Sequence, residues 1–338
     1  MKNKKIPVLC AFIVLLALSP AFSFELQDLQ DTADEFSAAL VQSIPFNSTL
    51  GLNWSDAYIG QFLNVPPHFG IGLSAGFTTL KMDPINKLLE YFKYEIPIDS
   101  QIGFLFPACT LEARIGGFFL PFDIGAKFGY LNTAEIDLFN SFGVNIDYLL
   151  IGADIRFALI DKKVLPLKLS IGVGFNYLKG GLSTTIENSG TSYSFKNPLN
   201  QTEYKISTSD LDLGLLWQAS VLELKAHVSF PVFIITPYAG VGVSYSWAKT
   251  GYQVKSKITA TEGGAPINLD DVYSILNGYG LSGISDQGFE SLTDVSDWNV
   301  RVYGGLSMNL TAIKLDFTMM YNIRDSAIGG TFGIRFQL

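Results

Sequence analysis

The chain has few of the side chains on which metal sites and disulfide frameworks depend. It holds two cysteines, Cys10 and Cys109, and two histidines, His68 and His227. Cys10 falls in an N-terminal stretch that we expect to be removed, so a single cysteine remains and no intramolecular disulfide can form. Two histidines and one cysteine are too few ligands for a transition-metal site. We therefore expect no metal and no cofactor.

Long apolar runs are missing after the first 23 residues. Three lysines precede the apolar residues 6–18, and Ala21-Phe22-Ser23 supplies small residues where a signal peptidase cleaves. This apolar stretch is too short to span a bilayer as a helix. Residues 1–23 are therefore typical of a secretory signal peptide. We expect cleavage near Ser23, with Ala21 as the alternative site.

Positive charge is scarce, most of all near the N-terminus. The whole chain has 23 basic and 31 acidic residues, and removal of the three lysines in residues 1–23 leaves 20 basic residues and a net charge of −11. Residues 24–80 contain no lysine or arginine. An acidic chain is repelled by a phosphate backbone, so we expect no nucleic-acid partner.

The first part of the exported chain has a helical pattern. Apolar residues recur every three or four positions within residues 24–43, and acidic residues occupy the other faces. The acids are Glu25, Asp28, Asp31, Asp34 and Glu35. Residues 44–68 are irregular in pattern, with prolines, glycines and asparagines. We expect residues 24–68 to form a periplasmic helical and irregular segment. It is either a passive cover at the mouth of the fold that follows or a plug that enters it.

From residue 69 to Leu338 the pattern is one of strands. In residues 298–338 apolar residues alternate with polar or charged ones, so each strand has one apolar and one polar face. Each apolar face continues for about ten residues, the length of a tilted strand that crosses a bilayer. We expect spans at residues 69–80, 104–119, 123–133, 144–159, 167–186, 204–229, 232–257, 298–309, 313–323 and 332–338.

Two details of these spans are less regular. The alternation of the span 204–229 slips near Val221-Leu222, which favours a β-bulge over an extra hairpin because no turn residues intervene. The long connections also contain helical patterns, at residues 83–94 and in a helix capped by Asn268.

Charged side chains within the spans share the polar face. A charge that faced lipid near the middle of the membrane would cost several kcal/mol, so we expect these side chains to face an enclosed lumen. The expected lumen residues are Glu112, Arg114, Lys127, Asp154, Arg156, Lys168, Glu223, Lys225, Arg301, Lys314, Asp316 and Arg335, with Asp123 on the same face of its span.

A soluble β-sandwich also alternates, with its apolar face inward. Aromatic residues at the ends of the apolar faces favour a membrane barrel, because such residues form belts at the two membrane interfaces. On the outer side these are Tyr130, Tyr177, Tyr245, Trp247, Trp298 and Tyr321. Glycines on the polar face suit a narrow, curved lumen better than a solvent-exposed face. We expect an all-β fold, a transmembrane antiparallel up-and-down β-barrel of about ten strands with an N-terminal helical segment.

The signal, the alternating spans of residues 69–338 and the final strand resemble bacterial outer-membrane β-barrel proteins of the porin-like kind. In that family the last residue is usually phenylalanine and helps the assembly machinery to recognise the strand. This chain departs from that pattern, since it ends in Leu338 with Phe336 two residues before. The segment before the barrel is similar to the hatch of FadL-type fatty-acid transporters. The resemblance implies location in the outer membrane, with the lipid bilayer and the outer-membrane assembly machinery as partners.

Several classes of function are compatible with such a barrel. Barrel enzymes of this family resemble one another in needing a histidine at the outer rim. Since His68 and His227 are expected at the periplasmic end, we expect no enzyme. The first hypothesis is a narrow channel or transporter for small solutes, gated or occluded by the N-terminal segment. The alternative is a non-conducting structural or adhesin-type barrel that displays extracellular loops. An apolar-ligand carrier would need an apolar interior, which the alternation does not predict.

Overall fold

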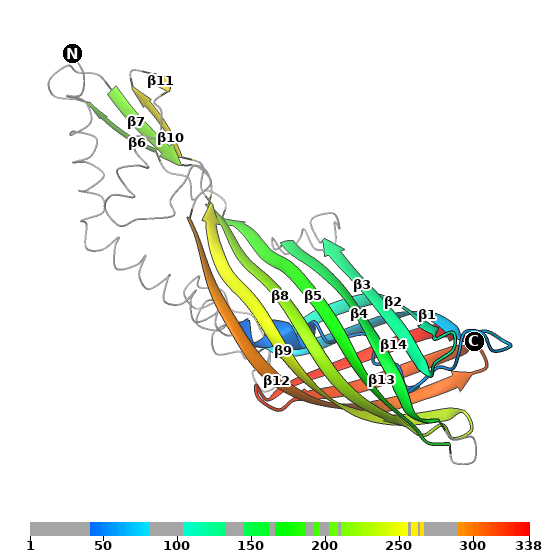
Figure 1. The fold of residues 1–338 in the computed structure, drawn as a ribbon. Helices are drawn as coiled ribbons and strands as arrows, with labels where there is room; N and C mark the ends of the chain where they lie inside the picture. The colour runs from blue at the N-terminus through cyan, green and yellow to red at the C-terminus, as the bar shows by residue number, and fades with distance from the viewer. Residues whose placement is uncertain are drawn as a thin grey trace.

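The structure is a computed structural model, and it describes residues 41–80, 104–132, 145–161, 166–186, 192–196, 203–208, 211–255, 258–262, 264–266 and 289–338. Within these ranges ten strands form a closed antiparallel barrel in the order β1-β14-β13-β12-β9-β8-β5-β4-β3-β2 (Figure 1). The strands are β1 (Phe69–Leu80), β2 (Phe104–Gly116), β3 (Phe122–Asn132), β4 (Asn145–Asp161), β5 (Lys168–Ile186), β8 (Leu211–Ser229), β9 (Ile235–Lys255), β12 (Phe289–Leu310), β13 (Ile313–Asn322) and β14 (Ala327–Gln337). The predicted fold class is confirmed.

The barrel is closed by its first and last strands. β1 pairs with β14 from Gly70 opposite Gln337 to Thr78 opposite Gly329. Every barrel strand therefore has a hydrogen-bonded neighbour on both sides. This closure is what allows a β-structure to lie in a bilayer, where water is absent from the hydrocarbon region.

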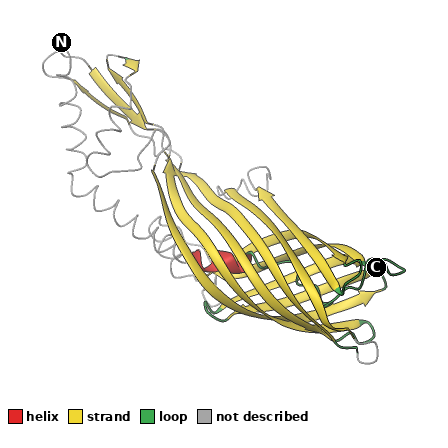
Figure 2. Cartoon of the chain, in the orientation of Figure 1, coloured by secondary structure: helices red, strands yellow, loops and turns green. Residues whose placement is uncertain are grey.

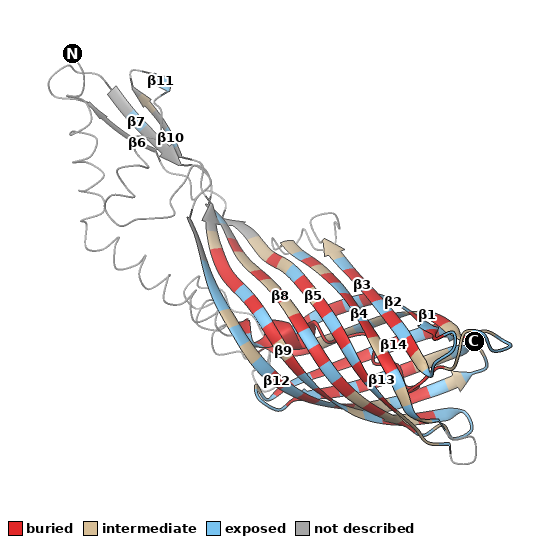
Figure 3. Ribbon diagram, viewed as in Figure 1, coloured by how far each residue is buried: buried red, intermediate tan, exposed pale blue. Residues whose placement is uncertain are grey.

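Inward and outward side chains alternate along each strand, as the stripes of Figure 3 show. In β3, Asp123 and Lys127 are buried, whereas Ile124 and Phe128 have exposed fractions of 45% and 48%. In a closed barrel the exposed apolar face is the outer surface. The outer surface is thus suited to lipid, and the charged face is enclosed.

The two ends of the barrel differ, and we name them by their connections. At the turn end, short connections join β2 to β3, β4 to β5, β8 to β9 and β12 to β13. At the loop end, long connections follow β1, β5 and β9. A small antiparallel sheet lies beyond the loop end in the order β11-β10-β7-β6 (Figure 1). Its strands are β6 (Ser192–Lys196), β7 (Glu203–Thr208), β10 (Ile258–Glu262) and β11 (Ala265–Pro266).

The expected single span 204–229 with a bulge is wrong. Residues 203–208 form β7 of the small sheet, and β8 pairs with β5 in unbroken register from Lys168 opposite Ser229 to Ile186 opposite Leu211. A register shift occurs instead in β4, between Ala158 and Ile160. The pattern slips at Val221 because the inward face of β8 becomes apolar there, while the strand itself continues regularly. The eighth span also begins earlier than expected, since β12 starts at Phe289.

The expected interfacial aromatic residues lie on the outer surface. Tyr130, Trp247, Trp298 and Tyr321 have exposed fractions between 40% and 59%, and Tyr177 and Tyr245 are half-buried. The Tyr245 ring packs edge-on against the rings of Trp247 and Trp298, at centroid distances of 4.9 and 5.0 Å. Their grouping on β9 and β12 makes a local aromatic surface.

Several expectations lie outside the described residues, namely the signal peptide, the acidic helical positions 25–35 and the two loop helices. In the part of the chain that the structure describes, no helix has the length and apolar character needed to cross a membrane.

Leu224→Arg tests the assignment of the outer face. Leu224 is 58% exposed near the middle of the lipid-facing part of β8. We expect a loss of about 2–4 kcal/mol in the free energy of unfolding, measured by denaturant titration of the refolded protein in lipid. Leu292→Arg is the control, because Leu292 lies near the loop end of β12, beyond its pairing with β13. Equal losses for the two variants would contradict the assignment.

Candidate functional site

The barrel interior is occupied by the chain's own residues 41–60. Residues 41–47 are helical, and the rest of the stretch is extended or turned. Figure 2 shows this helix enclosed by the strands of the barrel. Residues 43–59 are all buried. The site is therefore the contact surface between this segment, which we call the inner segment, and the inward faces of the strands.

The inner segment runs along the barrel from one end to the other. Its contacts with β2 and the turn after it show the direction. Asn47 Nδ2 donates to the carbonyl of Phe106 at 3.2 Å, Leu52 N donates to Glu112 Oε2 at 2.9 Å, and Phe62 N donates to the carbonyl of Gly117 at 3.0 Å. Because β2 begins at the loop end and finishes at the turn end, the segment also passes from the loop end to the turn end.

At the loop end the segment is packed in an apolar layer. Val41, Ile44, Phe46 and Leu50 belong to one buried cluster with side chains from the barrel wall. The wall members include Leu80, Phe106, Tyr148, Leu150, Leu178, Trp217, Ala219 and Val221. The Phe106 and Trp217 rings meet edge-on at a centroid distance of 5.3 Å. The alternation of the strands does not predict this apolar part of the interior.

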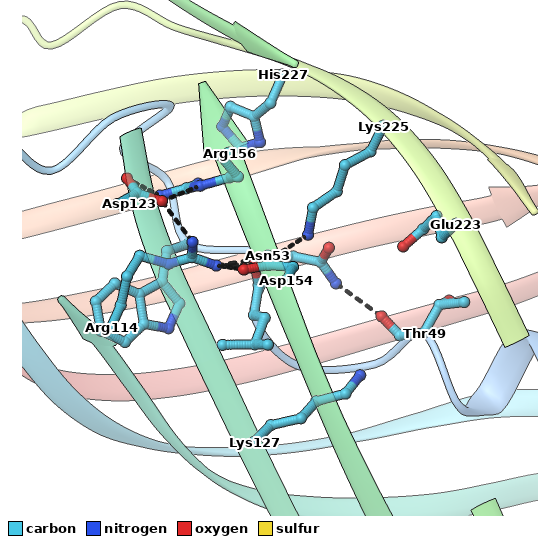
Figure 4. Close-up of polar contacts among 12 residues, drawn as sticks. Thr49, Asn53, Arg114, Asp123, Lys127, Asp154, Arg156, Glu223, Lys225 and His227 are labelled. Atoms are coloured by element: carbon cyan, nitrogen blue, oxygen red, sulfur yellow. Dashed lines mark hydrogen bonds and ion pairs between the residues drawn. The ribbon is translucent and has the colours of Figure 1, made fainter. Parts of the chain in front are cut away.

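Nearer the turn end the wall carries a connected network of buried ion pairs (Figure 4). Asp123 accepts from Arg114 at 2.6 Å and from Arg156 at 2.8 and 2.9 Å. Asp154 is 2.7 Å from Arg114 and 2.5 Å from Lys225. These pairs cross from strand to strand through β2, β3, β4 and β8.

A further pair lies on β8 and β12, where Arg301 Nε is 2.5 Å from Glu223 Oε1. Glycines leave room for these long side chains. A Cβ at Gly125 would lie 2.7 Å from Arg114 Nη2, and one at Gly242 would lie 2.5 Å from Glu223 Oε1. At these two positions, glycine leaves room for side chains that lie across neighbouring strands.

The inner segment supplies both charge and carbonyl groups to this network. Asp56 is 2.6 Å from Lys314 Nζ and 3.0 Å from Arg335 Nη2. Arg156 Nη1 donates to the Asp56 carbonyl at 2.8 Å, and Lys168 Nζ donates to that of Tyr58 at 3.0 Å. Basic groups of the wall thus bind acceptors of the segment.

Two further wall residues, Lys127 and Glu112, bind the inner segment. Lys127 Nζ donates to the carbonyl oxygens of Ser48 and Leu50 at 2.7 and 2.5 Å. Glu112 accepts from the Trp54 indole Nε1 at 2.6 Å. The Trp54 ring also has the guanidinium groups of Arg335 and Arg114 at 4.6 and 5.7 Å from its centroid, a cation–π arrangement.

Glycine is required at two positions of close contact. Gly51 of the inner segment has φ of +80°, and a Cβ there would meet Thr110 Oγ1 at 2.8 Å. At Gly116 of β2 a Cβ would lie 1.9 Å from the carbonyl oxygen of Gly60 and 3.0 Å from Phe62 N. The segment and the wall are therefore in backbone contact at the turn end.

The structure places the expected lumen residues on the inward face of the barrel. Of these, Lys168 and Lys314 are half-buried and the others are buried. The sequence analysis singled out neither Trp54 nor Asp56. A signal for Trp54 was present, because a tryptophan in a polar, irregular stretch without a basic residue needs a buried partner for its N–H group. In the described part of the chain, no group of histidine, cysteine and acidic residues has the arrangement of a metal site.

These features define a class. A closed barrel with an apolar outer belt and a charged interior is a transmembrane β-barrel of the bacterial outer-membrane type. No protein-family model matches the chain. No curated protein matches it either.

Solved outer-membrane barrels are similar to the chain at low identity. The outer-membrane protease OmpT of Escherichia coli is 10% identical, with 84% of this chain and 100% of that chain covered and a TM-score of 0.36. Ail, the attachment invasion locus protein of Yersinia pestis, is 11% identical over 80% and 98% of the two chains, with a TM-score of 0.26. A major outer membrane protein from Thermus thermophilus is 11% identical over 80% and 99%, with a TM-score of 0.27.

Asp123→Asn tests the ion-pair network. The substitution removes the charge that compensates both Arg114 and Arg156, whose side chains are fully or almost fully buried. We expect a loss of roughly 3–5 kcal/mol in the free energy of unfolding, since an uncompensated buried charge is left behind. Asp294→Asn is the control, because Asp294 and its partner Lys249 are 70% and 57% exposed, and we expect a loss below about 1 kcal/mol. A small loss for Asp123→Asn would show that Asp123 does not compensate the buried charges of Arg114 and Arg156 in the folded protein.

Proposed function

We propose that this outer-membrane barrel is a narrow channel or transporter for small solutes, occluded by its N-terminal segment, with residues 41–64 as the plug. The observation that carries the proposal is the way in which the charged wall holds the inner segment. Near the turn end it does so through ion pairs with Asp56 and hydrogen bonds to backbone carbonyl groups. Such polar contacts are exchanged for water when a segment leaves, so they suit a reversible closure better than a purely apolar core.

The charge of the lumen supports an anionic solute. The inward face carries eight basic residues (Arg114, Lys127, Arg156, Lys168, Lys225, Arg301, Lys314 and Arg335) and five acidic ones (Glu112, Asp123, Asp154, Glu223 and Asp316). The excess is three positive charges, and Asp56 of the segment reduces it to two. When the segment leaves, the net positive charge of the lumen therefore rises from two to three. The basic groups of the wall also lose the acceptors that the segment supplied. A ten-stranded barrel is narrow, so the solute is small.

Removal of residues 24–64 tests the proposal directly. We expect the shortened protein to conduct in planar bilayers with mild anion preference, whereas the chain that retains these residues stays largely closed. A second shortened protein, without residues 24–40 only, is the control, because it retains the described inner segment. An unchanged conductance after removal of residues 24–64 would contradict the plug, and cation preference would contradict the charge argument.

Gly116→Ala tests the same closure without a deletion. The new Cβ would displace Gly60 and Phe62 of the segment from the wall, so we expect more frequent openings in single-channel recordings. Gly333→Ala is the matched control, since its Cβ would meet atoms no closer than 3.4 Å, an ordinary contact distance. Identical open probabilities for the two variants would exclude close packing at Gly116 as part of the closure.

The second candidate is a non-conducting structural or adhesin-type barrel. It is favoured by the apolar layer at the loop end, which would have to be exposed to water if the segment left. The small sheet beyond the loop end is also a surface that such a protein could display. If the shortened protein folds without conducting, and excision of β6 and β7 abolishes binding to cells or matrix, the second candidate replaces the first.

A further inference from the structure

Two basic residues of the wall, Lys314 and Arg335, lie directly opposite each other in the register of β13 and β14. Like charges at opposite positions of an antiparallel pair repel each other and destabilise the sheet. In this barrel an anionic group lies between them, because Asp56 Oδ2 is 2.6 Å from Lys314 Nζ and 3.0 Å from Arg335 Nη2. The two strands therefore place a pair of basic groups where a single carboxylate oxygen bridges them.

The surroundings of Asp56 are those of a bound carboxylate. Arg335 Nη2 also donates to Ser55 Oγ at 2.8 Å, and Lys168 Nζ donates to the nearby carbonyl of Tyr58 at 3.0 Å. Hydrogen bonds between ionised partners are shorter and stronger than those between neutral groups. The inner segment thus brings one side-chain carboxylate to a cationic position of the wall.

Without Asp56, the wall has an uncompensated positive charge at this position. Asp316 Oδ2 lies 3.1 Å from Arg335 Nη1 and balances one of the two basic groups. Asp56 balances the other. Two basic groups and one acidic group of the wall have a net charge of +1, which a single carboxylate neutralises. A carboxylate of another molecule is therefore an electrostatic match for the place that Asp56 holds.

This position is less enclosed than the ion pairs deeper in the barrel. The side chains of Lys314 and Asp56 are 14% and 9% exposed, whereas those of Arg114 and Asp123 are 0% exposed. Lys314 is the second residue of β13 and directly follows the turn from β12 at the turn end. Water and small solutes at the turn end are therefore close to this pair of basic groups.

A cavity adjoins the site on the Arg335 side chain. It is lined by Arg335 and Asp316 together with Trp54, Thr318 and Thr331. The closed barrel thus contains a small polar space beside one of the two basic groups, into which the rest of a small solute can extend.

We propose that Lys314 and Arg335 form a binding subsite for the carboxylate group of a small organic acid, and that Asp56 occupies this subsite in the closed barrel. The proposal rests on the transport function proposed above, to which it adds the class of solute. A carboxylate that binds between the two basic groups takes the place of Asp56. Binding of the solute therefore competes with a contact that holds the inner segment, and links solute binding to release of the segment.

Formate binding to Asp56→Ala tests the subsite. This substitution removes a group of about the size and charge of formate and leaves the rest of the inner segment in place. The full chain is refolded in lipid, and a shift in electrophoretic mobility on heating shows that each variant is folded. Formate is titrated at constant ionic strength, and its binding is followed by the broadening of its NMR signal. Asp56→Asn is the matched control, because its amide fills the same space without the charge. A double variant, Asp56→Ala with Lys314→Met, removes one of the two basic groups.

We expect saturable binding of formate to Asp56→Ala, binding weaker by about tenfold or more to the double variant, and no binding to Asp56→Asn. Equal binding to Asp56→Ala and the double variant would overturn the proposal. Displacement of formate by an equal concentration of chloride would overturn it as well, because the site would then accept any small anion.

Refolding provides the readout if Asp56→Ala does not fold without an added anion. We then expect a higher yield of folded protein in formate than in chloride at the same ionic strength, and an equal yield in the two salts would contradict the subsite. Neither measurement involves a current. A barrel that fails to conduct would therefore contradict the proposed function and leave the formate result unchanged.

Discussion

The structure depends on mutual compensation between a charged barrel wall and the irregular segment that it encloses. When the two are apart, each leaves polar groups without partners inside the membrane: the wall has an excess of basic groups, and the non-helical backbone has N–H and C=O groups to satisfy. Here Asp56 is the acceptor for Lys314 and Arg335, while segment carbonyl groups accept from Lys127, Arg156 and Lys168. Each set of polar groups thus supplies partners to the other.

The interior is divided into two layers that act differently. In the apolar layer, burial of side chains such as Ile44 and Leu50 contributes stability in proportion to the area removed from water. In the ionic layer, the cost of desolvating charges offsets much of the attraction, so buried pairs set position more than they add stability. Trp54, whose ring contacts two guanidinium groups and whose N–H donates to Glu112, fixes the segment at one depth. The apolar layer therefore stabilises the segment inside the barrel, whereas the ionic layer and Trp54 set its position.

The alternation of single strands predicts the barrel, its strand count and the inward face because a period of two is a local property. The packing inside the barrel depends on which residues, far apart in the sequence, lie at the same height along the barrel axis. A local sequence pattern does not contain this information. Trp217, Ala219 and Val221 show the difference. In the sequence their apolar character indicates a slip of the strand, whereas in the barrel they share the inward face of Glu223 and belong to the same buried cluster as Phe106 and Ile44. The extent of β8 and β12 is also not predicted, because both strands continue beyond the membrane, where the outer face is no longer apolar.

If the inner segment fills the folded barrel in the membrane, its backbone amides are shielded from water. Hydrogen–deuterium exchange of the amides of Leu52, Ala57 and Ile59 in the lipid-embedded protein tests it most directly. In the structure these amides donate to Glu112, Ser229 and Asp123 inside the barrel. We expect protection comparable with that of the barrel strands. Exchange as rapid as that of the exposed turn at Phe233 would contradict it.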